Sequence, residues 1–330
     1  MKETIYVFSN GELKRQANTL YFEGDKGRRY IPVENVSGLM IFGEVTINKK
    51  LMEFISRNEI LLHFFNYYGY YVGTYYPREH YNSGYMILKQ AEHYIDEVRR
   101  LRLAFKFVEG ASANILRVLK YYKARDSELE ASIKEIEGLQ ARIAMQKGVE
   151  ELMAIEGNIR NRYYSAFNEI IKSDEFSFDK RTKRPPTTKL DALISFGNSL
   201  LYVAVLSEIY KTHLDPRIGF LHTTNFRRFT LNLDVAEVFK PIIVDRAIFS
   251  MLNRGMLREG HFMKELERIY LNEKGREIFV REFEDKLKAT IKHEKLKRNV
   301  SYRRLIRMEL YKIEKHLMGE SEYKPFVARW

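Results

Sequence analysis

Two hydrophobic periods divide the sequence. Over about the first 85 residues, short apolar runs alternate with turn residues, which is typical of β-strands. The pattern predicts strands over residues 4–8, 19–22, 29–33, 38–42, 45–47, 60–65 and 70–76. One helix over residues 48–57 interrupts them, because Leu51, Phe54 and Ile55 recur at helical spacing. Many short strands with turn signals favour a small sheet domain or sandwich.

From about Met86 the apolar positions follow the period of helices. The clearest run, among charged residues, is Ile133, Ile136, Leu139 and Ile143, and similar patterns recur to about residue 316. A polar, turn-rich stretch at 77–84 separates the two patterns, and a basic loop at 180–188 interrupts the second. We therefore expect an α+β chain, with a small β-sandwich-like domain over residues 1–86 and a larger all-α domain over residues 87–330.

The last predicted hairpin is rich in aromatic residues. Between residues 64 and 76, eight of 13 side chains are Phe or Tyr. Such a surface could stack nucleic-acid bases. A packed sheet or a subunit contact is the favoured interpretation, because nucleic-acid platforms carry adjacent Lys and Arg and this segment does not.

Charge and cysteine content narrow the function classes. The chain has 56 Lys and Arg against 44 Asp and Glu, a net charge of +12, of which +10 lies in residues 91–330. This excess suits either a nucleic-acid surface or simple solubility. The absence of Cys excludes disulfides, thiolate zinc sites, iron–sulfur clusters and a cysteine nucleophile, and is compatible with a cytoplasmic location.

No membrane association is expected. The beginning of the sequence lacks the pattern of a signal peptide. The longest uncharged stretch, between Asp191 and Glu208, has 16 residues and falls short of the ~20 that a membrane span needs. It predicts a buried core helix.

Glu156 is the first candidate for chemistry. Leu152, Ile159 and Tyr163 share its helical face, so the carboxylate lies on an otherwise apolar stripe. A carboxylate there is costly unless it is paired or bound to a metal. On spacing alone, an ion pair with Arg160 at i+4 is favoured over a metal ligand.

His222, Asp234 and Glu237 are the other candidates. His222 follows an apolar run, where a lone histidine is usually a hydrogen-bonded core residue. Asp234 and Glu237 are spaced either as an acidic capping box that opens a helix or as two ligands that reach one cation. With Glu156, this set of carboxylates and one imidazole suits Mg²⁺ or Mn²⁺ and suggests metal-assisted chemistry on phosphodiesters. Spacing across 80 residues does not show that the side chains meet.

Competing catalytic motifs are absent from the sequence. It has no P-loop, no nucleophile elbow, no HExxH zinc motif and no dinucleotide-binding glycine pattern.

Several ordered segments resemble the CRISPR-associated integrase family, whose members insert new spacers into a CRISPR array. The most specific is Leu-Asp-Pro-Arg-Ile-Gly-Phe-Leu-His at 214–222, followed by Asp234, Glu237 and Lys-Pro at 240–241. Ile-Glu-Gly at 155–157, Arg-Pro-Pro-Thr at 184–187 and Ala-Leu-Ile-Ser-Phe-Gly at 192–197 precede it in the family's order. The similarity extends over essentially the whole chain.

The resemblance implies a β-rich N-terminal domain for dimerisation or partner contacts and a helical catalytic domain. It implies a homodimer joined to a small partner protein, acting on double-stranded DNA. The family's metal ligands correspond to Glu156, His222 and Glu237, with Asp234 as a neighbouring catalytic acid, and the metal would be Mg²⁺ or Mn²⁺. The implied reaction is the attack of a spacer 3′-hydroxyl on a phosphodiester at the repeat boundary.

Three basic groups are candidate phosphate contacts. They are Arg181, Lys183 and Arg184 in the Pro-containing loop, Arg227 and Arg228 between the His and Asp of the site, and Arg303, Arg304 and Arg307 near the C-terminal helix pattern. Each group could instead be a solvated helix face, an alternative that is equally favoured for the last group. Arg227 and Arg228 are the favoured contacts because of their place in the chain. Two other functions stay open: a structure-selective, metal-dependent nuclease without an integrase role, and a non-enzymatic basic DNA-binding scaffold that dimerises through the aromatic hairpin.

Overall fold

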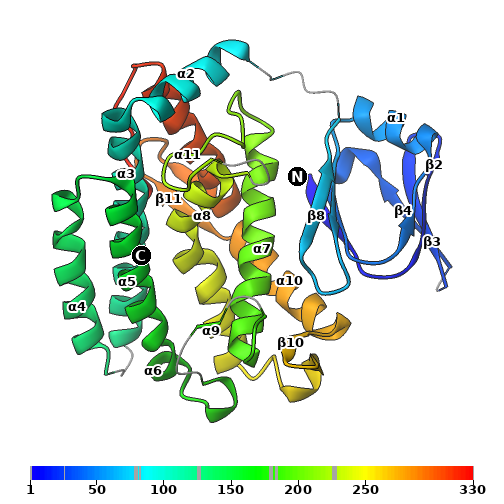
Figure 1. The fold of residues 1–330 in the computed structure, drawn as a ribbon. Coiled ribbons are helices and arrows are strands. Elements are labelled where there is room, and N and C mark those ends of the chain that lie inside the picture. Colours follow the sequence, from blue (N-terminus) through cyan, green and yellow to red (C-terminus); the bar gives the residue numbers. More distant parts are fainter. Residues whose placement is uncertain are drawn as a thin grey trace. The chain divides into compact units, whose positions relative to one another are not determined.

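The computed structural model describes residues 2–25, 27–77, 81, 83–124, 128–177, 181–182, 185–224 and 229–329. The chain divides into two compact units, Met1–Tyr81 and Asn82–Trp330, each with its own core (Figure 1). The first is built of strands and the second is mostly helical, which confirms the expected fold class. The boundary expected after residue 86 falls inside helix α2 (Gly84–Ile95), whereas the units divide after Tyr81.

The first unit contains two four-stranded sheets. One has the order β1-β5-β7-β8 and comprises Glu3–Val7, Val36–Ile41, Leu61–Phe65 and Tyr71–Tyr75; its first two pairings are parallel and the last is antiparallel. The other has the order β4-β3-β2-β6 and comprises Gly27–Pro32, Thr19–Gly24, Gly11–Gln16 and Val45–Thr46. Leu13, Leu20, Leu39 and Leu62 from both sheets, with Leu51 of α1 (Lys49–Arg57), share one hydrophobic core.

The aromatic hairpin is strands β7 and β8. Phe65 stacks on Phe42 with ring centroids 4.3 Å apart, and Phe42 stacks in turn on Phe8. Tyr67 at the turn and Val72 on β8 are more than half exposed. One side of the hairpin is therefore packed, which agrees with the favoured prediction of a packed sheet. The other side exposes apolar and aromatic groups.

The second unit is a bundle of helices. After α2 come α3 (Glu97–Lys123), α4 (Glu130–Ala141), α5 (Val149–Ser165), α6 (Phe167–Ile171), α7 (Lys189–Ile209), α8 (Leu231–Lys240), α9 (Arg246–Asn253), α10 (Glu273–Lys288) and α11 (Tyr302–Leu317). A π-helical turn, Pro241–Asp245, joins α8 to α9. The expectation that this domain is entirely α is wrong, because it also contains two β-hairpins. They are β9–β10 (Phe262–Glu265, Arg268–Leu271) and β11–β12 (Thr290–His293, Arg298–Ser301).

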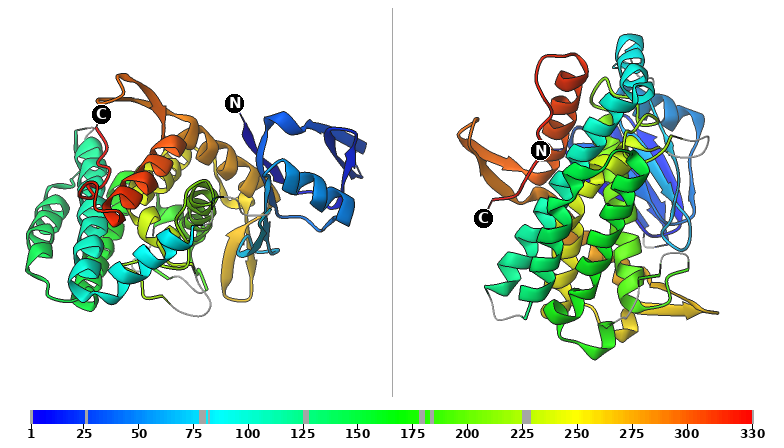
Figure 2. Two further views of the ribbon diagram at one scale, coloured as in Figure 1. Left: turned by 90° about the horizontal axis from the view of Figure 1, so that it is seen from above. Right: turned by 60° about the vertical axis from the view of Figure 1, so that its left-hand side comes forward.

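Helix α7 is the core helix expected from its long uncharged stretch. By length and composition it could cross a membrane, but 72% of its most apolar window is buried inside the protein. Helix α8 packs against both α3 and α7, so the helix that carries Asp234 and Glu237 is surrounded by the bundle (Figure 2).

The segment after α11 covers α8 and holds it in place. Phe326 stacks on Phe239 of α8, with centroids 5.5 Å apart and planes within 6°. The buried amide of Asn114 on α3 donates to the carbonyls of Val238 and Phe326 and accepts the backbone N–H of Ala328, at 2.8–2.9 Å. Distant parts of the chain thus fix the position of the helix that carries the site.

Candidate active site

Arg160 joins the two candidate carboxylates. It lies one turn after Glu156 on α5, and its Nε donates to Glu156 Oε1 at 3.2 Å. Its Nη2 bonds Glu237 on α8, so one guanidinium binds both acids. The predicted pair between Glu156 and Arg160 is confirmed, and it extends to a third group that spacing did not reveal.

Glu237 is also held by Lys240, one turn further along α8. The Lys240 ammonium bonds Glu237 Oε1 and lies 4.8 Å from the centre of the Tyr202 ring. Burial acts to raise the pKa of Glu237, but the charges of Lys240 and Arg160 outweigh it and lower that pKa to about 2. Glu237 is therefore ionised at neutral pH.

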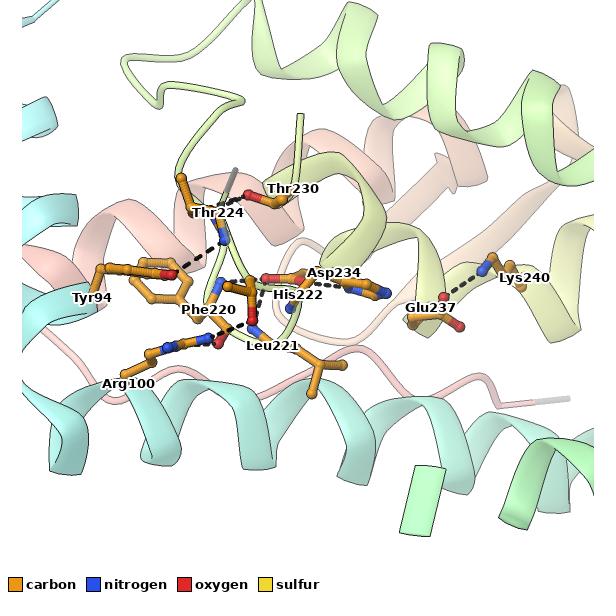
Figure 3. Close-up of polar contacts among 12 residues, drawn as sticks. Tyr94, Arg100, Phe220, Leu221, His222, Thr224, Thr230, Asp234, Glu237 and Lys240 are labelled. Atoms are coloured by element: carbon orange, nitrogen blue, oxygen red, sulfur yellow. Dashed lines mark hydrogen bonds and ion pairs between the residues drawn. The ribbon is translucent and has the colours of Figure 1, made fainter. Parts of the chain in front are cut away.

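Asp234 organises the segment that carries His222 (Figure 3). Its Oδ2 accepts the backbone N–H groups of Phe220 and Leu221, at 2.5 and 3.0 Å. Its Oδ1 accepts the backbone N–H of His222 at 3.0 Å and the His222 ring Nδ1–H at 2.7 Å. The carboxylate is completely buried, and these four bonds account for its position.

The capping-box interpretation of Asp234 and Glu237 is wrong. Helix α8 begins at Leu231 after Thr230, and no side chain caps it. Asp234 lies in the first turn and turns its carboxylate toward the preceding loop, because three buried N–H groups there need an acceptor. The carboxylate is a positioning group for His222, and its acceptor sites are already used.

Further residues, missed at the sequence level, support the same segment. Arg100 donates to the Phe220 carbonyl at 3.0 Å, and the Tyr94 hydroxyl accepts the Thr224 N–H at 3.2 Å (Figure 3). Gly219 is required by close approach, since a Cβ there would lie 2.7 Å from Asp234 Oδ2. The contacts of Arg100 and Tyr94 join segments more than 100 residues apart, and no local pattern signals them.

The hydrogen bond from Nδ1 fixes the state of the His222 ring. Because Asp234 is an acceptor, the proton stays on Nδ1, and the neutral ring has its lone pair at Nε2. Burial lowers the pKa of His222, but the hydrogen bond to Asp234 and the charges of Asp234 and Glu237 raise it more, so the net shift is upward. His222 and Glu237 are thus close enough to influence each other's ionisation.

Asp245, at the end of the π-helical turn, is a second buried acid beside Arg160. Its burial raises the pKa to about 7, against the opposing charges of Arg160 and Lys240. Its Oδ2 and the Nη1 of Arg160 have no hydrogen-bond partner among the described residues.

The donor chemistry of the site fits Mg²⁺ or Mn²⁺, although the donors are not gathered around one point. No group of three or more His, Asp or Glu side chains is close enough to hold a metal within the described part of the chain. Glu156 and Glu237 nevertheless meet at one cationic group, and His222 presents Nε2 with its other nitrogen held by a carboxylate. That arrangement around a histidine is typical of metal ligands.

The candidate DNA contacts fall into different environments. Arg181 is only 6% exposed in its side chain and bonds Asp191 at 2.6 Å, inside the protein. Arg303 and Arg307 are paired with Glu284 and Glu208, at 2.7 and 2.6 Å. Arg304 is exposed and has no ion pair with the described residues. Lys183, Arg184, Arg227 and Arg228 lie outside the residues that the structure describes.

Comparison with known proteins decides the family. Residues 5–285 match the family described as CRISPR associated protein Cas1. The chain belongs to the Cas1 family. It is 60% identical over 330 residues, the whole of both chains, to CRISPR-associated endonuclease Cas1 2 of Thermodesulfovibrio yellowstonii. It is 50% identical over 321 residues, 97% of this chain and 98% of the other, to CRISPR-associated endonuclease Cas1 of Thermotoga maritima.

Solved Cas1 structures confirm the architecture. A Cas1 protein from Thermotoga maritima superimposes with a TM-score of 0.89 at 48% identity, over 98% of this chain and 100% of that one. A casposase bound to integration product gives a TM-score of 0.89 at 19% identity, over 99% of this chain and 93% of that one, and shows a shared fold. The resemblance to the CRISPR-associated integrase family, stated from the sequence, is confirmed. The relatives named as endonucleases indicate that the chain is a CRISPR-associated nuclease of the Cas1 family.

Proposed function

We propose that this chain is a metal-dependent DNA integrase and endonuclease that inserts spacer DNA into a CRISPR array. The observation that carries the proposal is the convergence of Glu156 and Glu237 on one cationic group, beside a histidine whose Nε2 has no partner among the described residues. The fold shared with a casposase bound to integration product supports the joining reaction. The names of the Cas1 relatives support cleavage of DNA.

Glu156, His222 Nε2 and Glu237 would hold Mg²⁺ or Mn²⁺, and the metal when bound would polarise the phosphoryl oxygen and stabilise the leaving oxygen. Asp234 holds the His222 proton on Nδ1 and keeps Nε2 directed away from its own carboxylate. Arg160 and Lys240 keep Glu237 ionised, so no proton has to leave it before a cation binds.

The reaction is a transesterification. The oxygen of a spacer 3′-hydroxyl forms a bond to phosphorus at the repeat boundary and gives up its proton to solvent. The bond from phosphorus to the repeat 3′ oxygen breaks, and that oxygen takes up a proton to become a new 3′-hydroxyl. With water as the nucleophile, the same site hydrolyses the phosphodiester. Most of the rate gain would come from holding the two DNA segments in line.

We also propose a homodimer that works with a small partner protein on double-stranded DNA in the cytoplasm. A chain of the Cas6-RT-Cas1–Cas2 complex superimposes with a TM-score of 0.85 at 17% identity, over 100% of this chain and 36% of that one. Because that structure is a complex of a Cas1-containing chain with Cas2, it supports the proposal that this chain also works with a partner protein. The exposed side of the aromatic hairpin offers apolar area for such contacts.

One panel of variants tests the proposal. Wild type, Glu156→Ala and His222→Ala are assayed for Mn²⁺-dependent joining of a short duplex to repeat DNA, with Glu150→Ala as control because Glu150 is exposed on the same helix. We expect both site variants to lose joining while they keep their circular dichroism, and the control to join normally. Folded site variants that join DNA as wild type does would refute the assignment.

A blocked 3′ end separates integration from cleavage. If a duplex with a blocked 3′ end yields the same products as one with a free 3′-hydroxyl, the protein is a structure-selective nuclease and not an integrase.

A further inference from the structure

A pocket of about 380 Å³ opens in the helical unit where α2 and α3 meet the end of α11 and the segment after it. Its lining includes His93, Arg99 and Arg102 from one side, and His316, Ser321 and Glu322 from the other. The volume lies in the range of small-ligand sites. None of these residues takes part in the site around Glu156 and Glu237.

Hydrogen bonds fix the two histidine rings of the pocket. His93 donates through Nδ1 to the Lys89 carbonyl at 2.9 Å, whereas His316 Nδ1 accepts the backbone N–H of Tyr323 at 3.2 Å. In the neutral rings, His93 therefore keeps a lone pair at Nε2 and His316 carries its N–H there, and neither Nε2 has a partner among the described residues. The rings meet edge to face with centroids 5.8 Å apart.

The pocket carries uncompensated positive charge. Arg102 is exposed and has no hydrogen bond or ion pair with any described residue. Arg99 is bound by Glu92 and Asp96, and Glu322 has Lys106 4.0 Å away, so these charges are offset. Burial and the positive charges of His93 and Arg102 lower the pKa of His316, as expected of an imidazole in an electropositive site.

We propose that this pocket binds a phosphate group, either a terminal phosphomonoester of DNA or a phosphodiester of its backbone. The guanidinium of Arg102, the Nε2–H of His316 and the Ser321 hydroxyl are donors from several directions, which suits a tetrahedral oxyanion. Tyr94 and Arg100 on the same two helices hold the segment of His222, so the phosphate site and the catalytic histidine share one support.

The test uses the full chain in EDTA, where joining and cleavage do not interfere. Inorganic phosphate is titrated while the ring resonances of ¹³C-labelled histidine are followed by NMR. We expect saturable shifts at His93 and His316. Because a hydrogen bond to a charged group contributes about 1.5–3 kcal/mol, Arg102→Ala should weaken phosphate binding about tenfold or more.

Arg117→Ala is the matched control, since Arg117 is exposed on the same helix α3 and lies outside the pocket. It should change phosphate binding less than twofold. Arg102→Lys should fall between wild type and Arg102→Ala, because it keeps the charge and loses the planar fork. Glu156→Ala should bind phosphate as wild type does, so the result is independent of the proposed catalysis.

Two duplexes distinguish the sources of phosphate. If Arg102→Ala weakens binding of a 5′-phosphorylated duplex more than of its 5′-hydroxyl counterpart, the pocket takes a terminal phosphate; if both weaken equally while Arg117→Ala has no effect, it takes the backbone. Histidine resonances that stay in place at tens of millimolar phosphate would overturn the proposal. So would equal losses of DNA affinity in Arg102→Ala and Arg117→Ala.

Discussion

Asp234 offers the sharpest test of how the site is built. Asp234→Ala removes the acceptor of three backbone N–H groups and of the His222 ring. A hydrogen bond to a charged group contributes about 1.5–3 kcal/mol, and removing one partner of a buried network costs about 3–5 kcal/mol in total because the remaining groups relax. We therefore expect Asp234→Ala to lower the free energy of unfolding by about 3–5 kcal/mol.

The pH dependence of this loss follows from the His222 pKa. The folded-state pKa of His222 is raised, so its pair with Asp234 contributes most below the ordinary histidine pKa. That contribution fades as the pH rises through the raised value. The difference between wild type and Asp234→Asn should consequently be larger at pH 5 than at pH 9.

Urea unfolding followed by circular dichroism measures both effects. Asp285→Ala, at an exposed position on α10, is the control and should change the free energy of unfolding by less than about 0.5 kcal/mol. NMR titration should also show a lower His222 pKa in Asp234→Asn. A loss below about 1 kcal/mol in Asp234→Ala, or a loss that does not vary with pH in Asp234→Asn, would refute this account of the segment.

Three other variants probe the surroundings. Arg160→Ala should lower the free energy of unfolding by about 3–5 kcal/mol. In thermal melts, Mn²⁺ should raise the Tm of this variant more than that of wild type, because the metal replaces the missing positive charge at Glu237. An equal rise in both proteins would count against a cation position shared by Arg160 and the metal. Asp245→Asn should gain stability over wild type as the pH rises from about 4 to about 7, by at most about 4 kcal/mol. The reason is that the wild-type carboxyl ionises in the unfolded chain over this range, whereas its folded pKa of about 7 keeps it protonated in the folded protein. Unfolding curves across that range check the trend, and a difference between the two proteins that stays constant with pH would contradict it. Gly219→Ala should lower the free energy of unfolding in urea by about 1–3 kcal/mol, because its Cβ would lie 2.7 Å from Asp234 Oδ2. An unchanged free energy of unfolding would show that the backbone at Gly219 can shift to make room for a Cβ.

Most strands of the first unit could be predicted because their apolar residues alternate. Strand β2 was missed, since Gly11–Gln16 has Leu13 as its only fully buried side chain and reads as a polar connection. Its place in the sheet comes from pairing with β3 and β6. Hairpins β9–β10 and β11–β12 were missed for a similar reason: each of their strands has only four residues, and only pairing defines them.

Only some contacts of the candidate site could be predicted from the sequence. The contact between Glu156 and Arg160 follows from helical spacing, so the sequence predicts it. The contact from Arg160 to Glu237 crosses 77 positions, and no local period reports it. The prediction of a capping box was wrong because the Asp234 carboxylate accepts the N–H groups of residues 220–222, a loop that only tertiary packing brings to it. Asp245 went unnoticed as a buried acid because an aspartate within an apolar run gives no sign of its surroundings.

The support of α8 by residues 323–328 has a consequence for the order of synthesis. Asn114 leaves the ribosome well before Phe326 and Ala328, which lie 212 and 214 positions further on. At about 5–20 residues per second this interval lasts about 10–40 s. Until these last residues emerge, the Asn114 amide lacks its bonds to Phe326 and Ala328 and the Phe239 ring lacks Phe326, so the helix that carries Glu237 is not fully packed. A nascent chain that stops before Tyr323 would thus leave the helix that carries Glu237 without this support, and translation itself delays the full packing of that helix.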